Sequence, residues 1–160
     1  MSPRDSVAGP LAATVALLIP LAVLDRRMQS TGGPGIIPFE LAGPDGGPKI
    51  MQRWGSDGRR AARASLVLDF PFLAAYTTLN VRLAARAGGA LAPAVAATQV
   101  AAGACDAVEN TALLGVLARG GDARLSVVAR TAARIKFAGL YAGWLYFLVA
   151  LVRAAASRGS

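Results

Sequence analysis

The stretch LAPAVAATQVAAGACDAVENTALLGVLA, residues 91–118, is apolar almost throughout, yet it carries Asp106, Glu109 and Asn110 near its middle. As an α-helix it would be roughly 40 Å long, more than a hydrocarbon core about 30 Å thick requires. The three polar residues follow i, i+3, i+4 spacing, so they share one helix face. A carboxylate at mid-membrane depth costs roughly 2.5 to 3.5 kcal/mol unless partners or a water-filled cavity compensate it. This face is therefore the first candidate functional site.

The rest of the chain has the composition of a membrane protein. Its 160 residues are 54% hydrophobic and only 16% charged, and the mean hydropathy is +0.47. We predict an all-α fold, a polytopic four-helix transmembrane bundle that forms a single domain. The predicted spans are residues 7–24, 64–84, 91–118 and 134–152, with a long loop at 25–63, all within the domain 1–160.

The charge distribution predicts how the chain is oriented in the membrane. Seventeen Lys and Arg against nine Asp and Glu give a net charge of +8, which in a soluble protein would indicate nucleic-acid binding. Here the basic residues lie beside the spans, as anchors facing anionic lipid do, and no aromatic residues alternate with them. We therefore predict a membrane partner and no nucleic acid. Most basic residues flank the loops 25–63 and 119–133, so both loops are expected in the cytoplasm and both termini outside, in the cell (inner) membrane.

The residue types limit the possible chemistry. The sequence contains no histidine, which excludes ordinary histidine-based zinc, haem and di-iron sites and a histidine general base. Cys105 is the only cysteine, so an intramolecular disulfide is impossible. We predict neither a metal nor another cofactor. Any chemistry must then use carboxylates, Lys or Tyr.

The long loop contains turn signals and one tryptophan. Residues 30–48 are rich in Gly and Pro, which favours turns. Residues 49–63 have the pattern of a short amphipathic helix around Trp54, and tryptophan is typical of the membrane interface. Two interpretations are open: the loop lies along the membrane surface over the helix ends, with Trp54 near the bound molecule, or it is a solvated connector.

The second span carries a polar stripe. Asp69, Tyr76 and Asn80 are spaced by seven and four residues, so they lie along one side of a helix made otherwise of apolar residues. Pro71 follows Asp69 closely and favours a local kink, because proline removes a backbone donor. Irregular backbone at membrane depth is tolerated where it lines a cavity.

The third and fourth spans are expected to pack closely. Only about six residues separate the second span from the third, so these two helices are predicted to be antiparallel neighbours. The last span carries Lys136 near its start and a G-x-x-x-G match at Gly139 and Gly143. This motif favours a close helix approach, either inside the bundle or in a dimer.

Three spans can direct polar groups from similar depths toward one pocket. The candidate catalytic residues are Asp69, Asp106 and Glu109, and the candidate substrate-binding residues are Tyr76, Asn80, Asn110, Lys136 and Trp54. A purely structural interpretation is also open, in which Lys136 pairs with Asp69 and the other acids only fix helix register. In the functional interpretation, a carboxylic acid that keeps its proton serves as a proton donor.

Several of these residues resemble a known pattern. The matching positions are Phe39-Glu40-Leu41-Ala42-Gly43, Trp54, Leu68-Asp69-Phe70 with Tyr76, and Asp106-x-x-Glu109-Asn110. Over residues 36–114 this pattern resembles a family of uncharacterised bacterial four-helix integral membrane proteins, which implies the fold and no activity. In layout the chain is also similar to the EXPERA group of sterol isomerases and sterol-binding proteins. Isomerases of that group have a histidine that this chain lacks, so no catalytic residue is carried over.

The sequence predicts an intramembrane acidic pocket for a lipophilic ligand or substrate. If the protein is an enzyme, the expected chemistry is metal-independent isomerisation or cyclisation of an isoprenoid-like lipid by carboxylates. The alternatives are a small proton- or cation-coupled carrier and a structural or assembly subunit of a membrane complex. The expected partners are a lipid or lipophilic small molecule and, because four short helices enclose little space, a second copy of the chain in a homo-oligomer.

Overall fold

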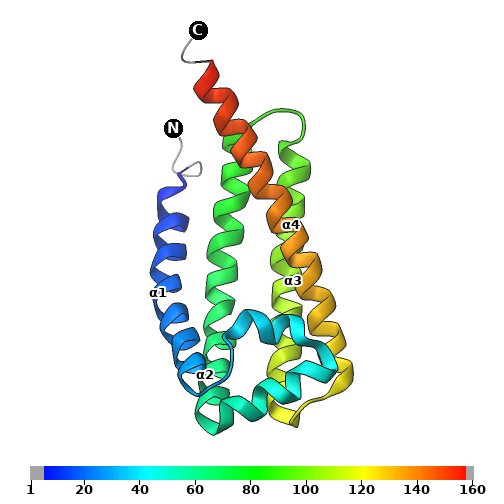
Figure 1. The fold of residues 1–160 in the computed structure, drawn as a ribbon. Coiled ribbons are helices and arrows are strands. Elements are labelled where there is room, and N and C mark those ends of the chain that lie inside the picture. The colour runs from blue at the N-terminus through cyan, green and yellow to red at the C-terminus, as the bar shows by residue number, and fades with distance from the viewer. Residues whose placement is uncertain (1–5, 158–160) are drawn as a thin grey trace.

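The computed structural model describes residues 6–157, and over that range the chain consists of helices without any strand. The elements are α1 (Ala8–Ser30), α2 (Ile36–Ala87), α3 (Ala92–Arg119) and α4 (Ala123–Ala156). All four are long and apolar enough to cross a membrane. Helices α2, α3 and α4 pack against one another, whereas α1 packs mainly against α2 (Figure 1). The predicted all-α four-helix bundle is confirmed at this level.

The segment that we expected to be a long loop is mostly helical. Helix α1 continues to Ser30, only Thr31–Gly35 lie between α1 and α2, and α2 begins at Ile36. The side chain of Asp25 accepts a hydrogen bond of 2.7 Å from the Ile36 backbone N–H, which satisfies a donor in the first turn of α2. The prediction of a loop over residues 25–63 was therefore wrong.

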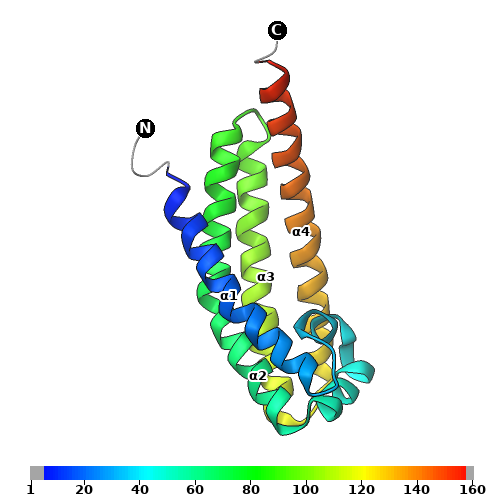
Figure 2. The ribbon, with the colours of Figure 1, turned by 60° about the vertical axis from the view of Figure 1, so that its left-hand side comes forward.

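Two glycines divide α2 into three helical pieces. Gly43 and Gly55 have φ values of +67° and +58°, in a region that essentially only glycine adopts. Pro44 directly follows the first break, where proline is favoured as the first residue of a new helix. The Gly and Pro residues therefore end and restart helices rather than form a loop. We call residues 36–54 the cap, because they fold across one end of the bundle, opposite the start of α1 and the end of α4 (Figures 1 and 2).

The main hydrophobic core lies where the cap meets the helices. Trp54 is 1% exposed, and its ring centroid lies 4.9 Å from that of Phe39. Its indole N–H donates a 2.7 Å hydrogen bond to the backbone oxygen of Pro34. We expected Trp54 at the membrane interface, but it is an internal residue that fixes the cap to the α1–α2 connection.

The remaining helix boundaries differ from the predictions in two places. We expected a kink near Pro71. The residues of α2 with non-helical dihedral angles are Gly43 and Gly55, so the backbone stays helical through Pro71. Helix α4 begins at Ala123 rather than near residue 134. The carboxylate of Asp122 caps its start, accepting hydrogen bonds from the backbone N–H groups of Arg124 at 3.0 Å and Leu125 at 3.1 Å.

The G-x-x-x-G motif of α4 packs against α3 within the chain. A Cβ atom added at Gly139 would lie 3.2 Å from the Cβ of Ala102, and one added at Gly143 would lie 2.2 Å from Nε2 of Gln99. Both glycines therefore face α3, and their lack of side chains lets the two helices approach closely. We left open whether this motif packs inside the bundle or in a dimer. In the structure, it packs inside the bundle.

Candidate functional site

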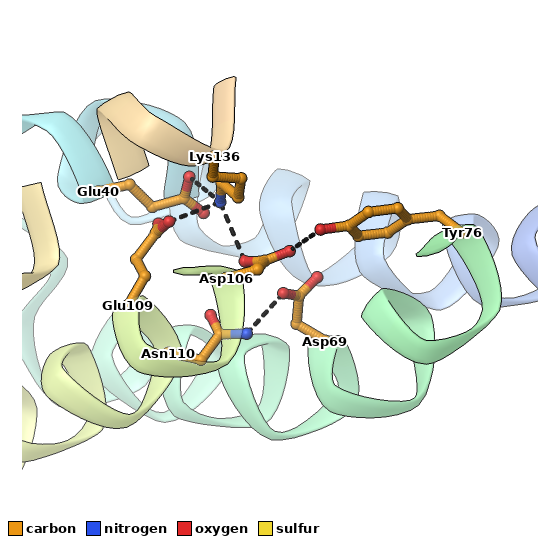
Figure 3. Close-up of polar contacts among 7 residues, drawn as sticks. All are labelled: Glu40, Asp69, Tyr76, Asp106, Glu109, Asn110 and Lys136. Carbon is orange, nitrogen blue, oxygen red and sulfur yellow. Dashed lines mark hydrogen bonds and ion pairs between the residues drawn. The ribbon is translucent and has the colours of Figure 1, made fainter. Parts of the chain in front are cut away.

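Lys136 is the centre of a buried ionic cluster. Its Nζ atom lies 2.7 Å from Oε2 of Glu109, 3.1 Å from Oδ1 of Asp106 and 3.2 Å from Oε2 of Glu40 (Figure 3). Each of the four residues is less than 9% exposed. Glu109 and Asp106 come from α3, Lys136 from α4 and Glu40 from the cap, so one ammonium group holds three parts of the chain together.

Glu40 is a residue of the cluster that we did not predict from the sequence. Glu40 lies in the segment that we predicted to be a loop, and folding of the cap is what brings it to Lys136 at 3.2 Å. The available signal was a single acid inside the mostly apolar run 36–42. An acid in such a run needs a partner when the run is buried.

A second set of polar contacts joins α2 to the cluster. Tyr76 donates a 2.7 Å hydrogen bond from its hydroxyl to Oδ2 of Asp106. Asn110 donates a 2.6 Å hydrogen bond from Nδ2 to Oδ2 of Asp69 (Figure 3). Asp69 is thus paired with an amide, and the alternative in which Lys136 pairs with Asp69 was wrong.

The cluster contains more acids than bases. Three carboxyl groups, those of Glu40, Asp106 and Glu109, contact the ammonium group of Lys136, and a fourth, that of Asp69, joins the cluster through Asn110. Within residues 6–157, Oε1 of Glu109 and Oδ1 of Asn110 are buried without a hydrogen-bond partner. Buried charges and unpaired acceptors are costly. Protonation of a carboxyl group would relieve this cost, so the cluster is suited to take up protons.

A cavity of about 770 Å³ lies beside the cluster and between the helices. Its polar lining includes Glu40, Asp69, Asp106, Asn110 and Lys136, and it continues to Asp25 and Gln29 near the end of α1. Its walls are mainly apolar and come from α1, the cap, α2 and α4, including Leu18, Pro38, Phe72, Leu79 and Leu140. Apolar walls with a few convergent polar groups are typical of a site for a small molecule.

Asn80 lies at a different part of the same cavity. Its Nδ2 donates a 2.9 Å hydrogen bond to Oε1 of Gln99, whose Nε2 donates a 2.9 Å bond to the backbone oxygen of Gly139. This chain of amides crosses from α2 through α3 to α4. Gln99 is 0% exposed and was not among the predicted site residues, although it lies on the same stripe of α3 as Asp106.

The structure brings together most, but not all, of the predicted site residues. Those that meet are Asp69, Tyr76, Asp106, Glu109, Asn110 and Lys136. Asn80 lines the cavity apart from them, and the cavity lining among residues 6–157 includes neither Trp54 nor Glu109. Glu109 instead lies behind the lining, in contact with Lys136.

Comparison with known protein families, curated proteins and solved structures finds no match. The resemblances to a bacterial membrane family and to the EXPERA group stay predictions. Within residues 6–157, no group of three or more His, Cys, Asp or Glu could hold a metal ion. The position among Glu40, Asp106 and Glu109 where a cation would sit is taken by the ammonium group of Lys136.

Proposed function

We propose that this chain is a multi-pass membrane protein that binds a lipophilic molecule in its cavity, with a polar end of that molecule against the acidic cluster. The observation that carries the proposal is the junction of a mainly apolar cavity of about 770 Å³ with the side chains of Asp69, Asp106 and Asn110. An apolar wall favours a hydrocarbon body, and the convergent polar groups orient one end.

Asp69 is the group best placed to exchange a proton with a bound molecule. It lines the cavity, and among residues 6–157 its side chain accepts a hydrogen bond from Asn110 at 2.6 Å. Both oxygens of Asp106 are held, one by Tyr76 and the other by Lys136. We therefore assign proton transfer to Asp69 and assign to Asp106 and Glu109 the placement of Lys136 and Tyr76.

The reaction that fits these groups is isomerisation or cyclisation of an isoprenoid-like lipid. The carboxylic acid of Asp69 donates its proton to one carbon of a double bond, and the electron pair of that bond forms the new C–H bond. Loss of a proton from a neighbouring carbon to the carboxylate then forms a new double bond, directly or after ring closure, and regenerates the acid. No oxidant, reductant or metal is required.

We propose that the protein lies in the cell (inner) membrane with the cap on the cytoplasmic side. The start of α1 and the end of α4 lie at the same end of the bundle, away from the cap (Figure 1). Twelve of the seventeen Lys and Arg lie within residues 26–63 and 119–136, and the positive-inside rule places these segments in the cytoplasm. Both termini are then outside.

Native mass spectrometry of the detergent-purified protein tests the proposal. We expect a lipophilic molecule to remain bound to the wild type and to be lost from Asp69→Asn, which removes the charge and the exchangeable proton at nearly constant shape. Asp57→Asn is the matched control, because Asp57 lies on α2 with its side chain 70% exposed. Absence of any bound lipophile from the wild type, or equal retention by the two variants, would contradict the proposal.

The surplus of acids favours a second candidate, a small proton-coupled carrier. Acidic side chains inside membrane spans form proton relays in many pumps and transporters. Proteoliposomes without any lipid substrate separate the two candidates. Proton flux that requires Asp69 and Asp106 and persists without a lipophile would favour the carrier, and absence of flux together with a bound lipophile would favour the binding protein or enzyme.

A further inference from the structure

The cavity has a second polar end, at Asn80. Asn80 is 6% exposed and lines the same cavity as Asp69. The two residues lie eleven positions apart on α2, so their backbones are separated by roughly 16 Å along the helix axis. A molecule that touches both residues must therefore be elongated and lie along α2.

The hydrogen bonds of the amide chain determine which atom Asn80 presents. The backbone oxygen of Gly139 can only accept, so the atom of Gln99 that contacts it at 2.9 Å must be the Nε2 donor. Oε1 of Gln99 then faces Asn80, and the atom of Asn80 that contacts it at 2.9 Å must be the Nδ2 donor. The acceptor Oδ1 of Asn80 is left over for other contacts.

The acidic end also presents acceptors. The Asn110 amide donates to Asp69 through Nδ2 and so holds the Asp69 carboxyl group in place, while its own Oδ1 is buried. Asp69 lines the cavity, and its carboxyl group has an acceptor oxygen in either protonation state. Between the two ends, Phe72, Leu79 and Leu140 give the cavity an apolar wall. A molecule that matches this cavity is a hydrocarbon that carries a hydrogen-bond donor at each end.

We propose that the ligand is an elongated lipophile of the α,ω-diol class, and that Asn80 selects it by accepting a hydrogen bond from the hydroxyl farther from the acidic cluster. This inference rests on the proposed function, because it assumes that a lipophile occupies the cavity. Under the competing explanation, the contact between Asn80 and Gln99 only joins α2 to α3, as polar pairs between membrane helices do.

Two probes of similar chain length distinguish these explanations: 1-dodecanol, with one hydroxyl, and 1,12-dodecanediol, with two. Binding to the full chain in nanodiscs is followed by tryptophan fluorescence, because Trp144 lines the cavity. We expect Asn80→Ala to weaken dodecanediol binding about 3- to 10-fold, the effect of one hydrogen bond, and to leave dodecanol binding unchanged. Comparing variants with the same probe cancels the different partitioning of the probes into the bilayer.

Three further variants separate the loss of the Asn80 acceptor from misfolding and from loss of the whole site. Asn80→Ser keeps an acceptor oxygen, so we expect it to retain part of the preference for the diol even if Asn80→Ala folds poorly. Asp69→Asn is expected to weaken binding of both probes, and Thr98→Ala, at an exposed position of α3, to change neither. Equal weakening of both probes by the Asn80 variants would overturn the inference and leave the proposed function standing. No binding of dodecanol to the wild type would overturn the proposed function itself.

Discussion

Oε2 of Glu109 lies 2.7 Å from Nζ of Lys136, and the two side chains are 0% and 7% exposed. Removing one partner of a buried ion pair leaves the other charge uncompensated, at a typical cost of about 3 to 5 kcal/mol. We expect Lys136→Met to cause a loss of this size in the free energy of unfolding, because Glu40 and Asp106 lose the same partner.

Thermal unfolding of the purified protein in detergent measures this effect. Arg134→Met is the matched control, because Arg134 precedes Lys136 by two residues on α4 and is exposed. A similar unfolding midpoint for the Lys136 and Arg134 variants would show that the ammonium group does not hold the cluster together.

The break at Gly55 gives a second prediction. Its φ of +58° is unfavourable for any residue with a side chain, while a Cβ atom there would meet nothing within 4 Å. Gly55→Ala should therefore destabilise the protein through backbone strain alone, by about 1 to 3 kcal/mol. Gly47→Ala is the control in the same segment, because its Cβ would lie at an ordinary 3.7 Å from Phe39. Equal unfolding midpoints for the two variants would contradict the break at Gly55.

Asp122 gives a prediction about pH. The backbone N–H of Leu125 and the side chain of Arg119 hold the pKa of Asp122 below its usual value. The folded state therefore favours the ionised form, so the stabilisation is complete above the ordinary pKa of about 3.9 and is lost as the pH falls through the folded pKa. We expect the wild type to be more stable than Asp122→Ala at pH 7, and this difference to shrink at pH 3.

Asp122→Asn is the control, because its amide oxygen can accept the same backbone hydrogen bonds without titrating. Its stability relative to Asp122→Ala should be the same at both pH values. If the difference between wild type and Asp122→Ala is instead constant with pH, the carboxylate does not contribute as an anion to the start of α4.

Residue spacing within a helix was enough to predict most of the site. Asp69 and Tyr76 share a side of α2, Asp106 and Asn110 share a side of α3, and a polar stripe in an apolar helix must face other helices. Such stripes predict polar contacts between the helices. The structure has two of them between α2 and α3, one between Tyr76 and Asp106 and one between Asn110 and Asp69.

The spacing of residues along a helix could not predict contacts between side chains that lie far apart in the sequence. Glu40 reaches Lys136 because Gly43 and Gly55, both with positive φ, end and restart the helix. The sequence signal at the first break, Gly43 followed by Pro44, is the same for a loop and for a helix break. Trp54 has the residue type of an interface anchor, but the backbone oxygen of Pro34 satisfies its N–H inside the core. Local composition does not distinguish these alternatives, because the partner lies elsewhere in the chain.

Gly143 tests whether the G-x-x-x-G motif of α4 serves the bundle or a homo-oligomer. A Cβ atom at Gly143 would lie 2.2 Å from Nε2 of Gln99, so Gly143→Ala must displace that amide or separate α3 from α4. We expect a loss of about 1 to 3 kcal/mol in stability, typical of overpacking, without any change in oligomeric state. Gly9→Ala is the control, because its Cβ would meet nothing within 4 Å on α1.

Thermal unfolding and native mass spectrometry of the same samples give both quantities. If the motif joined two copies of the chain, Gly143→Ala would dissociate an oligomer while leaving the monomer as stable as the wild type. The hydrogen bond from Gln99 to the oxygen of Gly139 predicts the opposite result, because the substituted side chain would push against the amide chain that links α2, α3 and α4.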